Sequence, residues 1–261
     1  MSKVITGFHA IEERVLALSK KKSDDAKNSQ ICYSKPGPRV KKIISAAKEA
    51  GVVVTQVDDS KLNELVAGLD KTLQDHRGIV LTVVGEAEPT ANLVDFDAWI
   101  KENSADDDKV RTVVILDRVT DPHNVGAIIR SCDQFGASLV IMPEHNSAND
   151  VQSNDVIARS SAGASAWIPF TIVNNLVRAC EKLKAAGFWI YGADAGGETC
   201  GKIQFPKKSA IVMGSEGTGI SQLLEKQCDT IVSIPTCGKI DSLNVSVAAG
   251  VLLYELYRRQ N

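Results

Sequence analysis

The chain has 261 residues, with 44% hydrophobic and 24% charged residues and a formal net charge of −2. These values are typical of a globular protein of one or two domains that can bury a sizeable core. There is no apolar run of about 18 residues and no apolar segment near the start, so the sequence predicts a cytoplasmic protein without a membrane span or a secretory signal.

The six cysteines and four histidines are scattered along the chain, with no Cys-x-x-Cys motif and no Cys/His pair at zinc spacing. This distribution favours reduced thiols over a metal centre. We therefore expect no metal site.

Residues 1–84 form the mildly basic part of the chain, with 14 Lys and Arg against 10 Asp and Glu. Their pattern predicts a small α/β domain with helices near 8–19, 38–50 and 60–67 and strands at 52–57 and 78–84. The basic clusters at 20–22 and 35–42 are consistent with contacts to a polyanion or with a solvated face, and the pattern leaves both open.

Residues 85–109 are acidic, with 8 Asp and Glu against 2 Lys. Pro89, an Asp triplet and a short amphipathic stretch near 96–100 predict a linker or a linking helix. An acidic docking segment is the functional alternative.

From residue 110 onward, apolar strands alternate with helical segments, as in a parallel α/β sheet that is covered on both faces. The predicted strands are 110–119, 137–143, 166–170, 188–194, 209–214 and 230–236, and the predicted helices are 124–135, 174–186, 221–228 and 244–259.

Three segments in this part lead from a strand through Gly, Asn and Ser into a helix. They are DRVTDPHNVGAIIRSCDQFG at 117–136, IVMGSEGTGIS at 211–221 and IPTCGKIDSLNVSVAAGVLLYEL at 234–256. Ligands of open α/β sheets bind beyond the carboxyl ends of the strands, where such loops and helix N-termini gather. The three segments therefore predict one shared site.

Two common nucleotide sites do not fit these segments. The stretch 214–221 has the glycines of a phosphate loop but lacks its Lys, and 122–130 offers a single Gly where a dinucleotide fold needs three. What remains is a pocket with a carboxylate at Glu216, amides at Asn124 and Asn244, and Arg130 on the same helix as Asn124. Ser242 and Asn244 precede the final helix, where plain N-capping is the alternative.

The patterns D-x-x-x-D-P-x-N-x-G-x-x-x-R-S, G-S-E-G-x-G and I-P-x-x-G-x-x-x-S-L-N-V-S-V-A-A-G occur here in this order. Together they resemble the three motifs of SpoU-type (TrmH-like) RNA ribose 2'-O-methyltransferases of the SPOUT superfamily. GFHAIEERVL, VVVTQVDDSKL and DHRGIVLTV in the N-terminal part are similar to the RNA-binding domain of the branch that methylates a guanosine of bacterial 23S rRNA. The resemblance covers nearly the whole chain.

The resemblance implies an α/β fold with a trefoil-knotted catalytic domain at 110–261, an acidic linker at 85–109 and an L30e-like RNA-binding domain at 1–84. It also implies a homodimer with each site near the subunit interface and S-adenosyl-L-methionine as methyl donor. The substrate would be 23S ribosomal RNA or its precursor. The residues carried over as catalytic are Asn124, Arg130, Glu216, Ser242 and Asn244, and those for the cofactor are Gly214, Ile234 and Leu243.

For the implied reaction we expect Arg130 to stay charged, to bind an RNA phosphate and to stabilise the developing alkoxide, because a guanidinium is a poor base. Asn124 and Asn244 would orient ribose and methionine groups, and Glu216 would hold a loop or a substrate amide. The hydroxyl proton would leave through phosphate, water or a neighbour such as Ser242.

Other functions stay open. A tRNA methyltransferase would carry the same three motifs, whereas an RNA-binding scaffold without methyl transfer would be expected to lack some of the five catalytic residues. A small-molecule or antibiotic-resistance enzyme is disfavoured by the separate basic N-terminal domain. The chain departs from the family pattern at Thr236 and Cys237 and in the Lys- and Asp-rich stretch 20–30.

Overall fold

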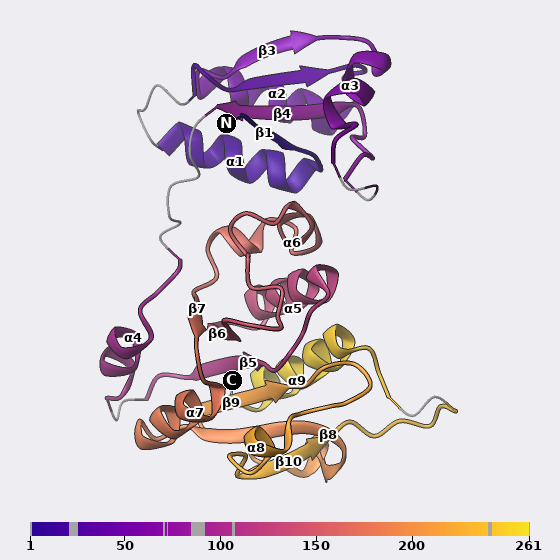
Figure 1. Cartoon of the computed structure of the whole chain (residues 1–261). Coiled ribbons are helices and arrows are strands. Elements are labelled where there is room, and N and C mark those ends of the chain that lie inside the picture. Colours follow the sequence, from indigo (N-terminus) through magenta and orange to yellow (C-terminus); the bar gives the residue numbers. More distant parts are fainter. Residues whose placement is uncertain are drawn as a thin grey trace. The chain divides into compact units, whose positions relative to one another are not determined.

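The computed structural model describes residues 2–20, 26–69, 71, 73–84, 92–105, 108–239 and 242–260 (Figure 1). The chain forms two compact units: unit 1 is Met1–Glu88 with Gln152–Ala166, and unit 2 is Pro89–Val151 with Trp167–Asn261. Parts of the predicted linker (85–91 and 106–107) and of the basic cluster (21 and 22) lie outside the described residues.

Unit 1 contains a four-stranded mixed sheet in the order β1-β4-β2-β3, in which only β2 and β3 pair in parallel. The three predicted helices and the two predicted strands are present at nearly the predicted positions. The short strands β1 and β2 were not predicted, because they are defined by their pairing with β4 and β3 and no local pattern indicated them. The elements are β1 (Ser2–Ile5), α1 (Phe8–Lys20), β2 (Gln30–Tyr33), α2 (Pro38–Glu49), β3 (Val53–Gln56), α3 (Asp59–Val66) and β4 (Ile79–Val84).

The sheet of unit 1 buries apolar side chains on both faces. Ile11 and Val15 of α1 and Ile43 of α2 pack with Ile31 and Leu81 of the sheet. On the other face, the smaller cluster of α3 comprises Cys32, Leu62, Val66 and Val80. Asp58 caps α3 by accepting the Lys61 N–H at 2.8 Å, which explains where this helix begins.

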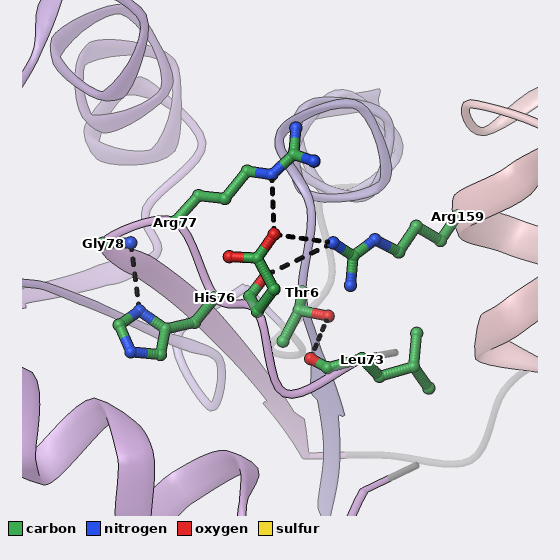
Figure 2. A network of polar contacts seen from close by, with 7 residues as sticks. Thr6, Leu73, His76, Arg77, Gly78 and Arg159 are labelled. Atoms are coloured by element: carbon green, nitrogen blue, oxygen red, sulfur yellow. Dashed lines mark hydrogen bonds and ion pairs between the residues drawn. The ribbon is translucent and has the colours of Figure 1, made fainter. Parts of the chain in front are cut away.

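Residues 152–166 lie in unit 1 although they follow β6 of the other sheet in the chain. They form α6 (Asp155–Ser160) and the short 3-10 helix η1 (Ala164–Ala166). Arg159 of α6 and Arg77 approach the Asp75 carboxylate at 3.3 and 3.1 Å. Figure 2 shows these two arginine side chains pointing toward the same carboxylate. Arg159 also donates to the Asp75 carbonyl at 3.4 Å. These contacts join a segment from the middle of the chain to the N-terminal sheet.

Unit 2 contains a six-stranded sheet in the order β10-β8-β9-β5-β6-β7, and every pairing is parallel, as predicted. Its elements are α4 (Phe96–Asn103), β5 (Arg111–Leu116), α5 (Pro122–Gln134), β6 (Ala137–Pro143), β7 (Phe170–Val173), α7 (Leu176–Ala185), β8 (Trp189–Thr199), η2 (Cys200–Lys202), β9 (Lys208–Met213), α8 (Gln222–Glu225), β10 (Thr230–Ser233) and α9 (Val245–Gln260).

Helices cover both faces of this sheet, which explains why its strands are near-continuous apolar runs. α4, α7 and α8 pack on one face, where Trp99, Leu183 and Leu224 meet Val113, Ile141 and other strand residues. α5 and α9 pack against each other (Figure 1). All six residues of β5 are buried at the centre of the sheet.

Several predicted boundaries in unit 2 were wrong. The strands predicted at 110–119 and 230–236 end at Leu116 and Ser233. β7 begins at Phe170, where pairing with Val140 starts, whereas the predicted strand 166–170 begins at the end of η1 and includes the exposed Trp167. β8 continues to Thr199 because its later residues pair with β10. α8 has only 4 residues in place of the predicted 221–228. Within the described part of the chain, no helix combines the length and the apolar character needed to cross a bilayer.

The ion pairs of Asp75 predict a pH-dependent contribution to stability. The hydrogen bond from Arg77, with the charges of Arg77 and Arg159, lowers the pKa of the Asp75 carboxyl. A carboxyl with a lowered pKa in the folded state stabilises the fold above its ordinary pKa, and this contribution is lost as the pH falls through the folded-state pKa. We expect Asp75→Asn to lower the free energy of unfolding by about 0.5 kcal/mol at pH 7, as for exposed ion pairs.

The difference between Asp75→Asn and the natural chain should shrink as the pH falls below about 4, as measured by urea unfolding. The matched control is Glu49→Gln, since Glu49 is exposed and makes no hydrogen bond or ion pair with the described residues. A stability difference that stays constant between pH 7 and pH 3 would contradict the role given to these ion pairs.

Candidate active site

A cavity lies at the carboxyl ends of β9 and β10 and beside the middle of β8 in unit 2. Its volume is about 350 Å³. The wall comes from 193–195 in β8, from Met213 and the loop after β9 as far as Gly219, from 232–236 with Ser242 and Leu243, and from the first two turns of α9. β5 is followed in the chain by β6 on one side of the sheet and β9 by β10 on the other, so the strand order reverses between β9 and β5, and such a switch point is where open α/β sheets bind their ligands.

The loop after β9 forms one side of the cavity and is closed on itself. Ser215 and Gly219 exchange two backbone hydrogen bonds of 3.1 and 3.0 Å. Gly214 has no room for a side chain, because a Cβ there would lie 2.2 Å from the carbonyl carbon of Gly219. The backbone of the loop therefore approaches itself closely and borders the cavity with main-chain groups.

Asp117 and Arg118, at the end of β5, hold this loop in place. The buried carboxylate of Asp117 accepts the Ser221 N–H at 2.7 Å, and the Arg118 guanidinium donates to the Gly219 carbonyl at 3.1 Å. Arg118 has a φ of +58°, a left-handed conformation that is uncommon for residues other than glycine. Our prediction missed both residues, although Asp117 is the first Asp of the first motif and could have been found there.

Asn124, Glu216 and Asn244, one from each of the three motif segments, meet in a single hydrogen-bonded cluster. Oε1 of Glu216 accepts from the Asn124 amide at 2.9 Å and from the Asn244 amide at 2.6 Å. The Asn244 amide also donates to Oδ1 of Asn124 at 3.0 Å. The cluster ties the start of α5 and the start of α9 to the loop after β9.

Asn244 also caps α9. Its Oδ1 accepts the Ser246 N–H at 2.9 Å and the Val247 N–H at 3.4 Å, while its Nδ2 donates to the cluster. The Asn244 side chain therefore both caps α9 and joins the hydrogen-bonded cluster. Asp121 caps α5 in the same way through the His123 N–H at 2.8 Å, which places Asn124 in the first turn of that helix.

The other predicted residues lie in different places. Arg130 lies on the exposed side of α5, outside the cavity wall, and makes no hydrogen bond or ion pair with the described residues. Ser242 is exposed on the wall just before α9. The predicted residues that line the cavity are Gly214, Glu216, Ile234, Ser242 and Leu243.

Charge on the cavity wall is negative. Of the residues that line it, two carry a formal charge, Glu216 and Asp194, and both are carboxylates. Asp194 was not predicted, since it lies between motif segments and no pattern marks it. The described residues contain no group of three or more His, Cys, Asp or Glu that could hold a metal ion.

None of the cysteines is among the described residues that line the cavity. All six are free, and Cys237, beside the cavity residue Thr236, is the exposed one. Burial raises the pKa of the Cys180 and Cys228 thiols to about 12. These two side chains are therefore protonated at neutral pH and belong to the core on the α7 face of the sheet.

The fold and the cavity define an α/β protein with a cavity of ligand size at the carboxyl ends of parallel strands. A 23S rRNA (guanosine-2'-O-)-methyltransferase of Ralstonia nicotianae is 34% identical and matches 100% of this chain and 97% of its own length. An uncharacterized tRNA/rRNA methyltransferase of Borreliella burgdorferi is 35% identical over 88% of this chain and 97% of its own.

Among solved structures, the SpoU methyltransferase AviRb of Streptomyces viridochromogenes, in complex with AdoMet, has the same fold. Its TM-score is 0.65 at 23% identity, with 99% of this chain and 90% of that one covered. The model of the SpoU rRNA methylase family matches residues 111–254, which include the first two motif segments and all but the last two residues of the third. The chain belongs to this family of RNA methyltransferases.

The close approach at Gly214 can be tested by substitution. Gly214→Ala should displace the loop after β9, because its Cβ would lie 2.2 Å from Gly219, and overpacking of this kind costs about 1–3 kcal/mol. The measurement is the free energy of unfolding from denaturant titration. Gly201→Ala is the control, since nothing closer than 4.0 Å meets its Cβ. Equal stability of both variants would contradict the crowding inferred here.

The shared acceptor at Glu216 gives a second prediction. Glu216→Ala leaves two amides without their acceptor, one of them on the buried Asn124, and should lower the free energy of unfolding by about 1–2 kcal/mol. Glu216→Gln keeps an acceptor oxygen at the same position and should lower the free energy of unfolding by less. If Gln and Ala prove equally harmful, the carboxylate charge, and not the hydrogen bonding, would be what the cluster needs.

Proposed function

We propose that the chain transfers a methyl group from S-adenosyl-L-methionine to a ribose 2'-hydroxyl of structured RNA, in the first instance a guanosine of 23S ribosomal RNA. The observation that carries this proposal is the meeting of the three motif segments in one hydrogen-bonded cluster of Asn124, Glu216 and Asn244, of which Glu216 lines the cavity. The activity printed for the Ralstonia nicotianae relative supports the choice of ribosomal RNA.

The cavity has the size and chemistry that this methyl donor requires. A volume of about 350 Å³ is within the range of small-molecule and cofactor sites. Gly214, Ile234 and Leu243 would hold the adenosine part through backbone groups and apolar contact, and a wall with two carboxylates suits a ligand with positive charge. When bound, the donor supplies a methyl group on a positively charged sulfur.

The residues of the chain would supply alignment and electrostatics. Alignment of hydroxyl oxygen, methyl carbon and sulfur alone contributes on the order of 7–11 kcal/mol in favourable systems. Asn124 and Asn244 are oriented by Glu216, so they are preorganised to position ribose and methionine groups. Glu216 thereby holds the loop after β9 to both helices.

Arg130 would act on the RNA and not on the donor. Its side chain is exposed and makes no ion pair with the described residues, which leaves the guanidinium available to an RNA phosphate. In the proposed reaction Arg130 stays charged and stabilises the developing alkoxide, while the hydroxyl proton leaves to phosphate, to water or to Ser242.

A homodimer belongs to this proposal. Val247, Val251, Tyr254 and Tyr257 form an exposed, largely apolar face on α9 with helical spacing. Apolar patches of this kind mark interaction sites, and a second copy would bring its own α5 and Arg130 to the same interface. The trefoil knot in unit 2, an L30e-like fold of the N-terminal domain and action in the cytoplasm are further parts of the proposal.

A tRNA substrate is the second candidate, because the relative from Borreliella burgdorferi is named for tRNA or rRNA. The two candidates are separated by mapping 2'-O-methyl groups, through their resistance to alkaline hydrolysis, on 23S rRNA and on tRNA treated with the enzyme. Methyl groups on tRNA alone would overturn the ribosomal assignment.

The role of Arg130 predicts a graded loss of activity. Arg130→Ala should lower kcat by about 100-fold or more, as for loss of a group that stabilises an oxyanion, and Arg130→Lys should lose less. Both variants should retain the pH profile of the natural enzyme, measured by methyl transfer to 23S rRNA. The control is Arg178→Ala, an exposed Arg on α7. A lost basic limb in Arg130→Lys, with RNA affinity intact, would identify Arg130 as a true base.

A further inference from the structure

Asp194 lies in a stretch of β8 that bulges out of the sheet at the mouth of the cavity. Gly192 pairs with Ile231 of β10, and the next pairing joins Glu198 to Val232, so residues 193–197 have no counterpart on β10. On the other side, the pairing of β8 with β9 ends at Gly192. Bulges redirect side chains and are frequent beside active sites.

The bulge requires a glycine at its end. A Cβ on Gly197 would lie 2.4 Å from the carbonyl oxygen of Ile231, so the backbone of the bulge returns to β10 without space for a side chain. At the other end, Oδ1 of Asp194 accepts the Gly196 N–H at 3.0 Å. These two contacts give the Asp194 side chain a defined direction.

The second carboxylate oxygen of Asp194 faces the cavity. A Cβ placed on Gly219, on the opposite loop, would lie 3.6 Å from Oδ2 of Asp194. This oxygen accepts no hydrogen bond from the described residues, whereas the other charged group of the wall, Glu216, is engaged by two amides. Asp194 is therefore a wall carboxylate with an oxygen that can interact with a ligand. None of the wall residues described is Lys, Arg or His.

We infer that Asp194 is a specificity-determining residue of the cavity, whose carboxylate favours the positively charged methyl donor over the uncharged thioether that remains after transfer. This inference rests on the proposed function. In the transfer the methyl group forms a bond to the ribose oxygen, the electron pair of the broken carbon–sulfur bond stays on sulfur, and the hydroxyl proton passes to water. The positive charge on sulfur thus disappears, whereas the ammonium group of the methionine part is common to donor and product.

The consequence is a cavity that binds donor and product unequally. A carboxylate attracts a full positive charge a few ångströms away, and the attraction ends when that charge is removed. The remaining contacts, to adenosine and to the methionine chain, are common to donor and product. Asp194 would therefore promote exchange of product for a new donor after each turnover.

The test compares the affinities of S-adenosylmethionine, sinefungin and S-adenosylhomocysteine for the full-length protein by isothermal titration calorimetry. Sinefungin carries an amine in place of the sulfonium group, and S-adenosylhomocysteine has no charge at that position. Asp194→Asn keeps an oxygen for the Gly196 N–H and removes the charge. We expect this substitution to lower the affinity for S-adenosylmethionine and sinefungin about fivefold and to change the affinity for S-adenosylhomocysteine less than twofold, as expected for one exposed charge.

Glu198→Gln is the matched control, because Glu198 is an exposed carboxylate on the same strand but outside the cavity wall. Thermal unfolding of each variant checks that the fold is intact, and Asp194→Lys should enlarge the loss for the cationic ligands.

If Asp194→Asn lowers the affinity for all three ligands equally, the inference is overturned, because the carboxylate would then contact a group common to them, such as the ribose hydroxyls. Unchanged affinities would overturn it as well. If the natural protein binds none of the three ligands, the proposed function itself fails, and that result is distinct from the other two.

Discussion

The carboxylate of Glu216 is the contact on which the rest of the site depends. Its Oε1 receives amides from Asn124 at the start of α5 and from Asn244 at the start of α9, two residues 120 positions apart in the chain. Neither helix could be positioned against the loop after β9 by capping alone, because capping satisfies only the backbone of its own helix. The shared oxygen links the three segments into one structure.

Close approach of backbone to backbone is the second constraint, and it acts twice around the cavity. At Gly214 the loop after β9 folds onto Gly219, and at Gly197 the bulge of β8 returns to Ile231. In both places a side chain would occupy the space of main-chain atoms. The cavity is therefore bordered in part by main-chain atoms, and the two carboxylates of its wall determine its charge.

Most helices and strands follow from local pattern. The strands of unit 2 are apolar runs because helices cover both faces of its sheet, and residues 137–143 match β6 at both ends. Where the prediction was wrong, pairing between distant strands decided the outcome: Phe170 begins β7 opposite Val140, and the end of β8 pairs with β10. The strands Ser2–Ile5 and Gln30–Tyr33 likewise depend on their partners in the mixed sheet.

The sequence by itself determined the parallel α/β architecture and the three motif segments, because each is encoded in a short stretch of chain, and the family resemblance of these segments pointed to Gly214, Glu216, Ile234, Ser242 and Leu243, which line the cavity. Only the tertiary structure decided that Asn244 both caps its helix and joins Glu216, that Arg130 lies outside the cavity wall, and that Arg159 packs with unit 1. It also placed Asp194 at the cavity. These features depend on contacts between residues far apart in the chain, and local periodicity carries no information about such contacts.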